Sequence, residues 1–210
     1  MMNALPPMDL TALGDRLPRR HRPKTAYLAR LALQALGWEI TGSLPNIPQA
    51  VIIGVPHTSN YDGVPALLAS LALDVDIRVL GKKQLFAVPI LSHLLRWVGV
   101  MPIDRDKKGS VLQANIDRFA TGKPFFLALA PEGTRACKPS FKTGFYYLAL
   151  GAGVPIVPVA LDYQSKQIRF MPPFEPTGDY DADLPKILAY YQGVTARHPK
   201  NMAKILQDLP

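Results

Sequence analysis

Residues 51–80, VIIGVPHTSNYDGVPALLASLALDVDIRVL, contain the pattern that decides the fold. The short apolar run at 51–55 predicts a buried strand, and a polar loop follows it. The leucine- and alanine-rich stretch 63–73 predicts a helix, and residues 77–80 predict a second strand. A strand, a helix and a strand in this order are typical of a unit whose two strands pair in parallel.

The same alternation continues along the chain. Further strands are predicted at residues 98–103, 125–130 and 154–161, with an edge strand at 168–171. Further helices are predicted at residues 84–97, 109–120, 141–150, 184–197 and 201–206. The pattern therefore predicts an α/β fold with a mixed, largely parallel central sheet flanked by helices, preceded by an N-terminal amphipathic helix. Active sites in such sheets lie beyond the carboxyl ends of the strands.

Composition narrows the classes of function. With 210 residues, 48% of them hydrophobic, the chain is long enough for one domain with a sizeable core. Its single cysteine, Cys137, excludes an internal disulfide and a cysteine-rich zinc site. The net charge of +8 points to an anionic partner, and nucleic acid, an anionic membrane surface and a phosphorylated substrate all meet that condition.

Three segments are expected from the composition along the chain: a flexible basic arm at residues 1–24, a helix at 25–44 and the main domain at 45–210. The helix is apolar and ends near Trp38. It either lies in a membrane interface or packs on the core of its own domain. We expect no membrane-spanning helix, because glycines and prolines interrupt the long uncharged runs. We also expect no signal peptide, because residues 1–13 are only weakly apolar and the basic cluster follows them rather than precedes them.

The first candidate for chemistry is the loop after the strand at 51–55, HTSNYD, which places His57 and Asp62 five residues apart. If a helix begins at the loop's end, the aspartate folds back towards the strand and can orient the imidazole as a general base. The alternative is that Asn60 or Asp62 is only a helix cap.

Basic and acidic side chains follow the next strands of the predicted sheet. They are Lys82 and Lys83, then Arg105, then the run Glu132, Gly133, Thr134 and Arg135. Arginine beside glycine at a strand end suits an oxyanion such as phosphate. Residues 78–142, which include these groups, hold twelve basic and four acidic residues. Each of these strand ends, taken alone, is also compatible with an ordinary turn that carries a surface arginine.

Together these segments resemble the motifs of the glycerolipid acyltransferases, the lysophosphatidic acid acyltransferase family. Residues 57–62 are similar to its first motif, H-x4-D, and residues 82–86 to the lysine-containing stretch that precedes the second. Residues 99–105, 131–135 and 154–159 are similar to the second, third and fourth motifs. The ordered set covers roughly residues 50–161. It departs from the family pattern at Gln84, Ala130 and Ala136, where glutamate, phenylalanine and serine are common.

The resemblance implies that residues 45–210 form an acyltransferase domain. Its reaction transfers a fatty acyl group from acyl-CoA or acyl carrier protein to the hydroxyl of a lysolipid, best lysophosphatidic acid. His57 is implied as the general base and Asp62 as its orienting partner. The residues implied to hold the acceptor's phosphate are Arg105 and Arg135, helped by Lys82 or Lys83. Those implied to shape the loop are Glu132, Gly133 and Thr134.

Other expectations concern partners and alternatives. Another lysolipid such as lyso-ornithine lipid remains an alternative acceptor, and a non-catalytic lipid-binding protein is an alternative function. We expect peripheral attachment to the anionic cytoplasmic face of the inner membrane, and no nucleic-acid partner because few aromatic residues accompany the basic ones. No metal and no cofactor other than the acyl thioester are expected.

Overall fold

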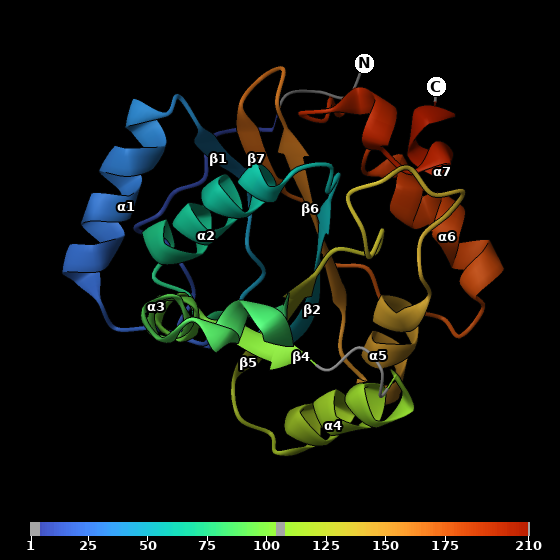
Figure 1. Cartoon of the computed structure of the whole chain (residues 1–210), viewed down its shortest axis with the longest axis horizontal. Coiled ribbons are helices and arrows are strands. Elements are labelled where there is room, and N and C mark those ends of the chain that lie inside the picture. Colours follow the sequence, from blue (N-terminus) through green and yellow to red (C-terminus); the bar gives the residue numbers. More distant parts are fainter. Residues whose placement is uncertain (1–4, 104–107, 210) are drawn as a thin grey trace.

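The structure is a computed structural model that describes residues 5–103 and 108–209. Its central element is a seven-stranded sheet in the order β1-β7-β6-β2-β5-β3-β4 (Figure 1). Its strands are β1 (Glu39–Gly42), β2 (Gln49–Val55), β3 (Ile77–Lys82), β4 (Val100–Ile103), β5 (Phe125–Leu129), β6 (Ile156–Asp162) and β7 (Gln167–Phe170). The strands from β6 to β4 run in parallel, β7 is antiparallel to β6, and β1 is parallel to β7. The predicted mixed, largely parallel sheet is confirmed.

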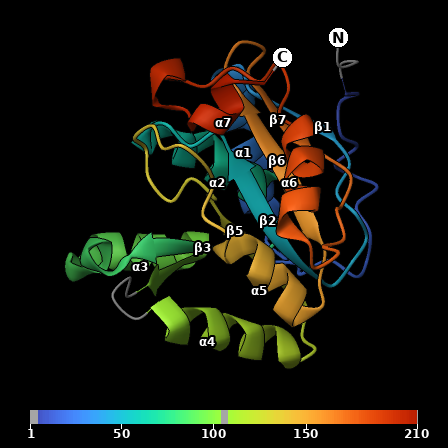
Figure 2. The same cartoon turned by 90° about the vertical axis from the view of Figure 1, so that its right-hand side faces the viewer.

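Helices cover both faces of this sheet (Figures 1 and 2). They are α1 (Pro23–Ala35), α2 (Gly63–Ala72), α3 (Pro89–Val98), α4 (Lys108–Ala120), α5 (Gly144–Ala152), α6 (Tyr180–Ala189) and α7 (Lys204–Gln207), with 3-10 turns η1 (Asn60–Asp62), η2 (Lys83–Ala87) and η3 (Pro199–Asn201). Along β2, Ala50 and Ile52 belong to the core under α1 to α3, whereas Val51 and Ile53 belong to the core under α4 to α7. This alternation is the period of a strand buried on both faces.

One edge of the sheet differs from the prediction. The strand predicted at 168–171 is present as β7, but it is not an edge strand, because β1 pairs beside it. β1 lies within the stretch expected to be helical up to residue 44. Its four residues are too few to show a periodic pattern, and its pairing partner lies more than a hundred residues away in the sequence.

The N-terminal helix α1 packs on α2 and has two apolar faces. Ala26, Ala29 and Leu33 are buried, whereas Leu28 on the opposite face is 64% exposed. Trp38, which follows the helix, is only 5% exposed. The helix therefore joins the core through one face and presents the other to solvent, and Trp38 belongs to the core rather than to that exposed face.

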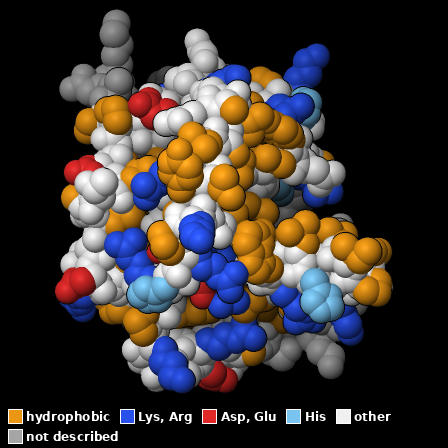
Figure 3. All heavy atoms as spheres, turned by 90° about the vertical axis from the view of Figure 1, so that its left-hand side faces the viewer, with side chains coloured by type: hydrophobic (Ala, Val, Ile, Leu, Met, Phe, Trp, Pro, Cys, Tyr) orange, Lys and Arg blue, Asp and Glu red, His pale blue; other side chains and the backbone are white. Residues whose placement is uncertain are grey.

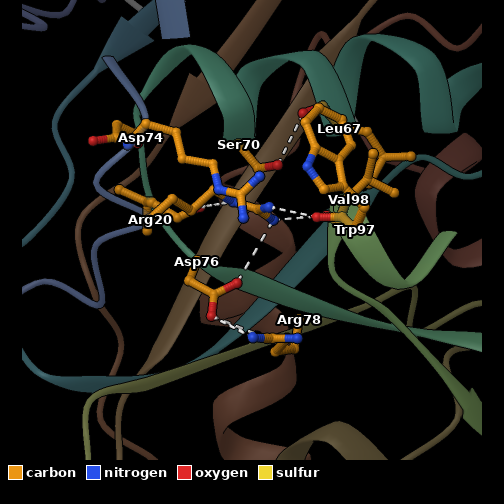
Figure 4. Close-up of polar contacts among 10 residues, drawn as sticks. Arg20, Leu67, Ser70, Asp74, Asp76, Arg78, Trp97 and Val98 are labelled. Carbon is orange, nitrogen blue, oxygen red and sulfur yellow. Dashed lines mark hydrogen bonds and ion pairs between the residues drawn. The ribbon is translucent and has the colours of Figure 1, made fainter. Parts of the chain in front are cut away.

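Residues 5–22, which belong to the segment predicted as a basic arm, lie against the sheet and α2. Leu17 is buried, and the side chain of Arg20 is 8% exposed. Figure 4 shows the Arg20 guanidinium directed at the last carbonyls of α3, with distances of 3.0 Å to the Trp97 oxygen and 2.7 Å to the Val98 oxygen. It also lies 3.7 Å from Asp76. A basic side chain is favourable there because the end of a helix leaves carbonyls unpaired and carries partial negative charge.

Candidate active site

His57 and Asp62 lie where β2 ends and η1 begins, at the carboxyl edge of the sheet. The turn forms because Ser59 and Asp62 make a capping box, in which the Asp62 carboxylate accepts the Ser59 N–H at 2.8 Å. The chain thereby folds back and brings Asp62 Oδ2 to 3.3 Å from His57 Nδ1. With Nδ1 directed at the carboxylate, Nε2 is the ring nitrogen available to a substrate. The predicted pairing of His57 with Asp62 is therefore present in the structure.

The Asp62 carboxylate is 1% exposed and accepts several hydrogen bonds. Oδ2 accepts the N–H groups of Thr58 at 2.7 Å and Ser59 at 2.8 Å, and Oδ1 accepts the hydroxyl of Tyr163 at 2.6 Å. Burial alone raises the pKa of a carboxyl group. Here the donors, including His57, outweigh burial and hold the pKa of Asp62 below its usual value. Asp62 therefore remains an anion beside the imidazole.

Glu132 is the second buried carboxyl group at the site, and it follows β5 in the sequence. Its Oε1 accepts the backbone N–H of His57 at 2.6 Å, so it joins the loop after β5 to the loop after β2. The residue is 1% exposed, and Oε2 has no hydrogen-bond partner among the described residues. Burial raises the pKa of Glu132 to about 7, an effect that the hydrogen bond from His57 only partly offsets and that the charge of Asp62 increases.

Gly133 is required by the path of the loop that follows Glu132. Its φ of +65° is in the left-handed region, and an added Cβ would lie 2.7 Å from the Cε atom of Lys142. The Lys142 N–H also donates to the Pro131 carbonyl at 2.8 Å. The glycine therefore allows Lys142 to cross directly over the loop that carries Thr134 and Arg135.

A cavity of about 980 Å³ opens at the dyad. Polar residues at one part of its lining are His57, Asp62, Thr134, Arg135 and Lys142. Most of the other lining residues are apolar. They include Ile52 and Ala128 from the face under α2 and Phe145 and Leu148 from α5. Its lining therefore includes residues from both faces of the sheet, and it includes Leu129, where β5 ends while its neighbours β2 and β3 continue.

The predicted basic residues have different positions. Arg135 lines the cavity, and Lys83 is exposed at the start of η2. Lys82 is the last residue of β3, and its side chain lies outside the described part of the structure. Arg105 also lies outside the described residues. Within residues 5–103 and 108–209, no group of three histidine, cysteine or acidic side chains is arranged to hold a metal ion.

Three residues near the dyad were not among the predicted site residues. Tyr163 directly follows β6. The expectation that active sites lie beyond the carboxyl ends of the strands therefore points to this residue as well. Lys142 lies ten residues after Glu132, and only the returning chain brings it to the cavity. Arg197 places its guanidinium carbon 4.1 Å from the centre of the Tyr61 ring. Its neighbour His198 donates its N–H to the Thr58 hydroxyl at 3.2 Å, so the C-terminal segment supports the loop after β2.

The fold and the site define an α/β protein in which a histidine–aspartate pair faces a large apolar cavity with cations at its polar end. The family model described as Acyltransferase matches residues 39–162, more than half of the chain. The chain belongs to this acyltransferase family, which confirms the resemblance drawn from the sequence motifs.

Individual relatives agree with this assignment. Over 119 residues, 54% of this chain, it is 33% identical to a 1-acyl-sn-glycerol-3-phosphate acyltransferase of Salmonella typhimurium. Over 160 residues, 70% of this chain and 28% of the relative, it is 29% identical to human lysophosphatidylcholine acyltransferase 2. The chain spans about half the length of the bacterial relative, 47%.

The fold also resembles a solved structure, the 1-acyl-sn-glycerophosphate acyltransferase PlsC of Thermotoga maritima. The TM-score is 0.56 with 19% sequence identity, over 78% of this chain and 73% of that one. At this identity the likeness supports the α/β fold.

The raised pKa of Glu132 predicts a specific dependence of stability on pH. The folded protein keeps this proton between pH 4.5 and about 7, where the unfolded chain has lost it. The contribution of Glu132 to the free energy of unfolding is therefore complete below pH 4.5 and falls by about 3 kcal/mol as the pH rises through 7. Glu132→Gln removes the titration and keeps an oxygen for the His57 N–H.

Urea unfolding of both proteins at pH 5 and pH 8 measures this difference. We expect the wild type to lose more stability than Glu132→Gln between the two pH values. Equal losses would show that the buried carboxyl group does not titrate in this range.

Proposed function

We propose that this protein transfers a fatty acyl group from an acyl thioester, carried by CoA or acyl carrier protein, to the free hydroxyl of lysophosphatidic acid. The observation that carries the proposal is the His57–Asp62 pair at the polar end of an apolar cavity. The family and the names of its relatives support the same reaction. The proposed reaction needs no covalent acyl-enzyme, because the attacking oxygen belongs to the acceptor.

His57 acts as the general base in this proposal. Its Nε2 takes the proton from the acceptor hydroxyl as the oxygen attacks the thioester carbonyl. The tetrahedral intermediate collapses, the C–S bond breaks, and the thiolate leaves with the proton that His57 returns. Asp62 remains ionised and stabilises the imidazolium formed on the way.

The cavity provides room for the acyl chain. Its volume of about 980 Å³ lies at the upper end of the range for ligand pockets, and its walls are mainly aliphatic and aromatic. Gly54 and Gly63, which also line it, add no side chain beside the dyad. A long hydrocarbon chain therefore has an apolar environment that begins next to His57.

Arg135 and Lys142 make a phosphate monoester the acceptor headgroup that this site fits best. Both side chains are exposed, line the same cavity as His57 and present N–H donors on cationic groups. Charge-assisted hydrogen bonds from such groups are stronger than neutral ones. A phosphate held there places the glycerol hydroxyl of the acceptor towards the dyad.

His57→Ala is expected to lower acyl transfer about 100- to 10,000-fold, the usual cost of losing a general base. The assay measures thiol release from oleoyl-CoA or an acyl carrier protein thioester, with lysophosphatidic acid, other lysophospholipids and lyso-ornithine lipid as acceptors. Lys123→Ala, which replaces an exposed residue of the loop between α4 and β5, is the control and should keep wild-type turnover.

Each outcome of this assay has a defined meaning. Turnover with a different lysolipid would keep the mechanism and change the acceptor. Near wild-type turnover by His57→Ala would remove His57 from the role of base. Silence of the wild type with every donor and acceptor would favour a non-catalytic lipid-binding protein.

Arg135→Ala is expected to raise the KM for lysophosphatidic acid about 10-fold or more, because a hydrogen bond to a charged group contributes about 1.5–3 kcal/mol. The KM for the acyl thioester should change less than about twofold. Steady-state kinetics with each substrate varied in turn measures both values. Lys138→Ala, an exposed cation three residues further on, should change neither. Equal increases for both substrates would contradict a specific role in binding the acceptor.

We further propose that the protein attaches to an anionic membrane surface through α1 and α3. Among the described residues, no helix is long and apolar enough to cross a bilayer. Both helices nevertheless expose large apolar side chains, with Leu28 at 64%, Ile90 at 86% and Leu94 at 54% exposure. Figure 3 faces this side and shows apolar groups beside lysine and arginine side chains. The Arg22 guanidinium lies 5.9 Å from the Trp97 ring centre and joins the two areas.

The double variant Leu28→Ser with Ile90→Ser should bind vesicles containing phosphatidylglycerol about 10-fold or more weakly, because two apolar side chains no longer enter the interface. Sedimentation with the vesicles measures the bound fraction. Leu150→Ser, an exposed leucine of α5, is the control and should bind like the wild type. An unchanged bound fraction for the double variant would place membrane contact elsewhere.

A further inference from the structure

Tyr163 is the residue outside the family motifs that contacts the dyad most directly. It follows β6 immediately and is half-buried. Its hydroxyl donates to Asp62 Oδ1 at 2.6 Å, across 101 residues of sequence. The other oxygen of this carboxylate, Oδ2, lies 3.3 Å from His57 Nδ1. The phenol and the imidazole therefore lie against the same carboxylate, and each contacts a different oxygen.

The Tyr163 side chain is held in place from two directions. The Trp38 ring packs edge-on against its ring, with 4.9 Å between centroids and an angle of 87° between the ring planes. The Tyr163 N–H donates to the Thr195 carbonyl at 2.8 Å, and the buried Asp162 accepts the Thr195 N–H at 3.1 Å. The hydroxyl is therefore presented to Asp62 from a rigid support, which a positioning role requires.

We propose that Tyr163 is a positioning residue of the His57–Asp62 pair, which it supports by fixing the rotation of the Asp62 carboxylate. This inference rests on the proposed function, because it assigns Tyr163 a role in that reaction. Tyr163 acts through Asp62 and transfers no proton to substrate.

The geometry explains why the second oxygen matters. Rotation of the carboxylate about its Cβ–Cγ bond moves both oxygens and changes the direction in which the carboxylate meets the imidazole, and the N–H groups of Thr58 and Ser59 hold only Oδ2. The hydroxyl on Oδ1 opposes this rotation. Burial, together with the neighbouring carboxylate, raises the pKa of Tyr163, so the phenol stays protonated and remains a donor. The pair is therefore oriented without a change in protonation of Tyr163.

Tyr163→Phe tests the proposal because it removes only the hydroxyl. We expect kcat to fall about 10-fold with both KM values within about twofold of the wild type. The matched control is Tyr146→Phe, whose hydroxyl donates to the buried carboxylate of Asp183 at 2.8 Å between α5 and α6. That variant loses the same kind of hydrogen bond, so we expect a lower Tm and an unchanged kcat. An unchanged kcat in Tyr163→Phe would overturn the inference.

A double-mutant cycle separates action through Asp62 from direct contact with substrate. In an Asp62→Ala background, Tyr163→Phe should cause no further loss of kcat, because the carboxylate it orients is already absent. The same 10-fold loss in both backgrounds would overturn the inference, since Tyr163 would then act independently of Asp62.

A measurement without turnover keeps this inference distinct from the proposed function. In protein labelled with 15N-histidine, the His57 Nδ1–H proton gives an NMR signal characteristic of its hydrogen bond to Asp62. We expect Tyr163→Phe to shift or broaden this signal and Tyr146→Phe to leave it unchanged. If the wild type transfers no acyl group, the proposed function fails. The signal then still tests whether Tyr163 orients Asp62 against His57. A signal unchanged by Tyr163→Phe would overturn the inference.

Discussion

The buried carboxylate of Asp62 is the constraint on which the rest of the site depends. An ionised carboxylate at 1% exposure needs donors to replace water, and it has the N–H groups of Thr58 and Ser59, the Tyr163 hydroxyl and the His57 ring. These donors come from the loop after β2 and from the end of β6. The adjacent position of β2 and β6 in the sheet therefore brings the donors together.

The parallel sheet and half of this arrangement were predictable from the sequence. The apolar runs that became β2, β5 and β6 are long enough to identify buried strands, and the helices between them require parallel pairing. His57 with Asp62 was predictable because the turn that joins them is local and closes through a capping box. Glu132 and Arg135 were predictable as strand-end residues. The bond of Glu132 to the His57 backbone was not, because it depends on how two distant loops meet.

The remaining features depend on contacts across long stretches of chain. β1 has four residues and exists because β7 lies beside it. The same pairing brings the end of the N-terminal segment to the site, where Trp38 packs on Tyr163. A tryptophan directly after an apolar helix is as typical of a membrane anchor as of a helix packed on its own core. The sequence pattern alone therefore does not show that Trp38 is buried. Only the strand order of the sheet decides between the two interpretations.

The two buried carboxyl groups next to His57 show that burial alone does not decide ionisation. Asp62 and Glu132 are both 1% exposed, yet the pKa of Asp62 is lowered and that of Glu132 is raised to about 7. The difference follows from the hydrogen bonds, because Asp62 has donors on both oxygens, several on Oδ2 and the Tyr163 hydroxyl on Oδ1, while Oε2 of Glu132 has none among the described residues. Below pH 7 the ionised carboxylate of Asp62 therefore lies beside the His57 ring, while the neutral carboxyl group of Glu132 accepts the His57 backbone N–H. A second negative charge there would compete with Asp62 for the imidazolium and, in the proposed reaction, would repel a phosphorylated acceptor. Asp62 thus supplies the negative charge beside the imidazole, and Glu132 holds the backbone of His57 in position.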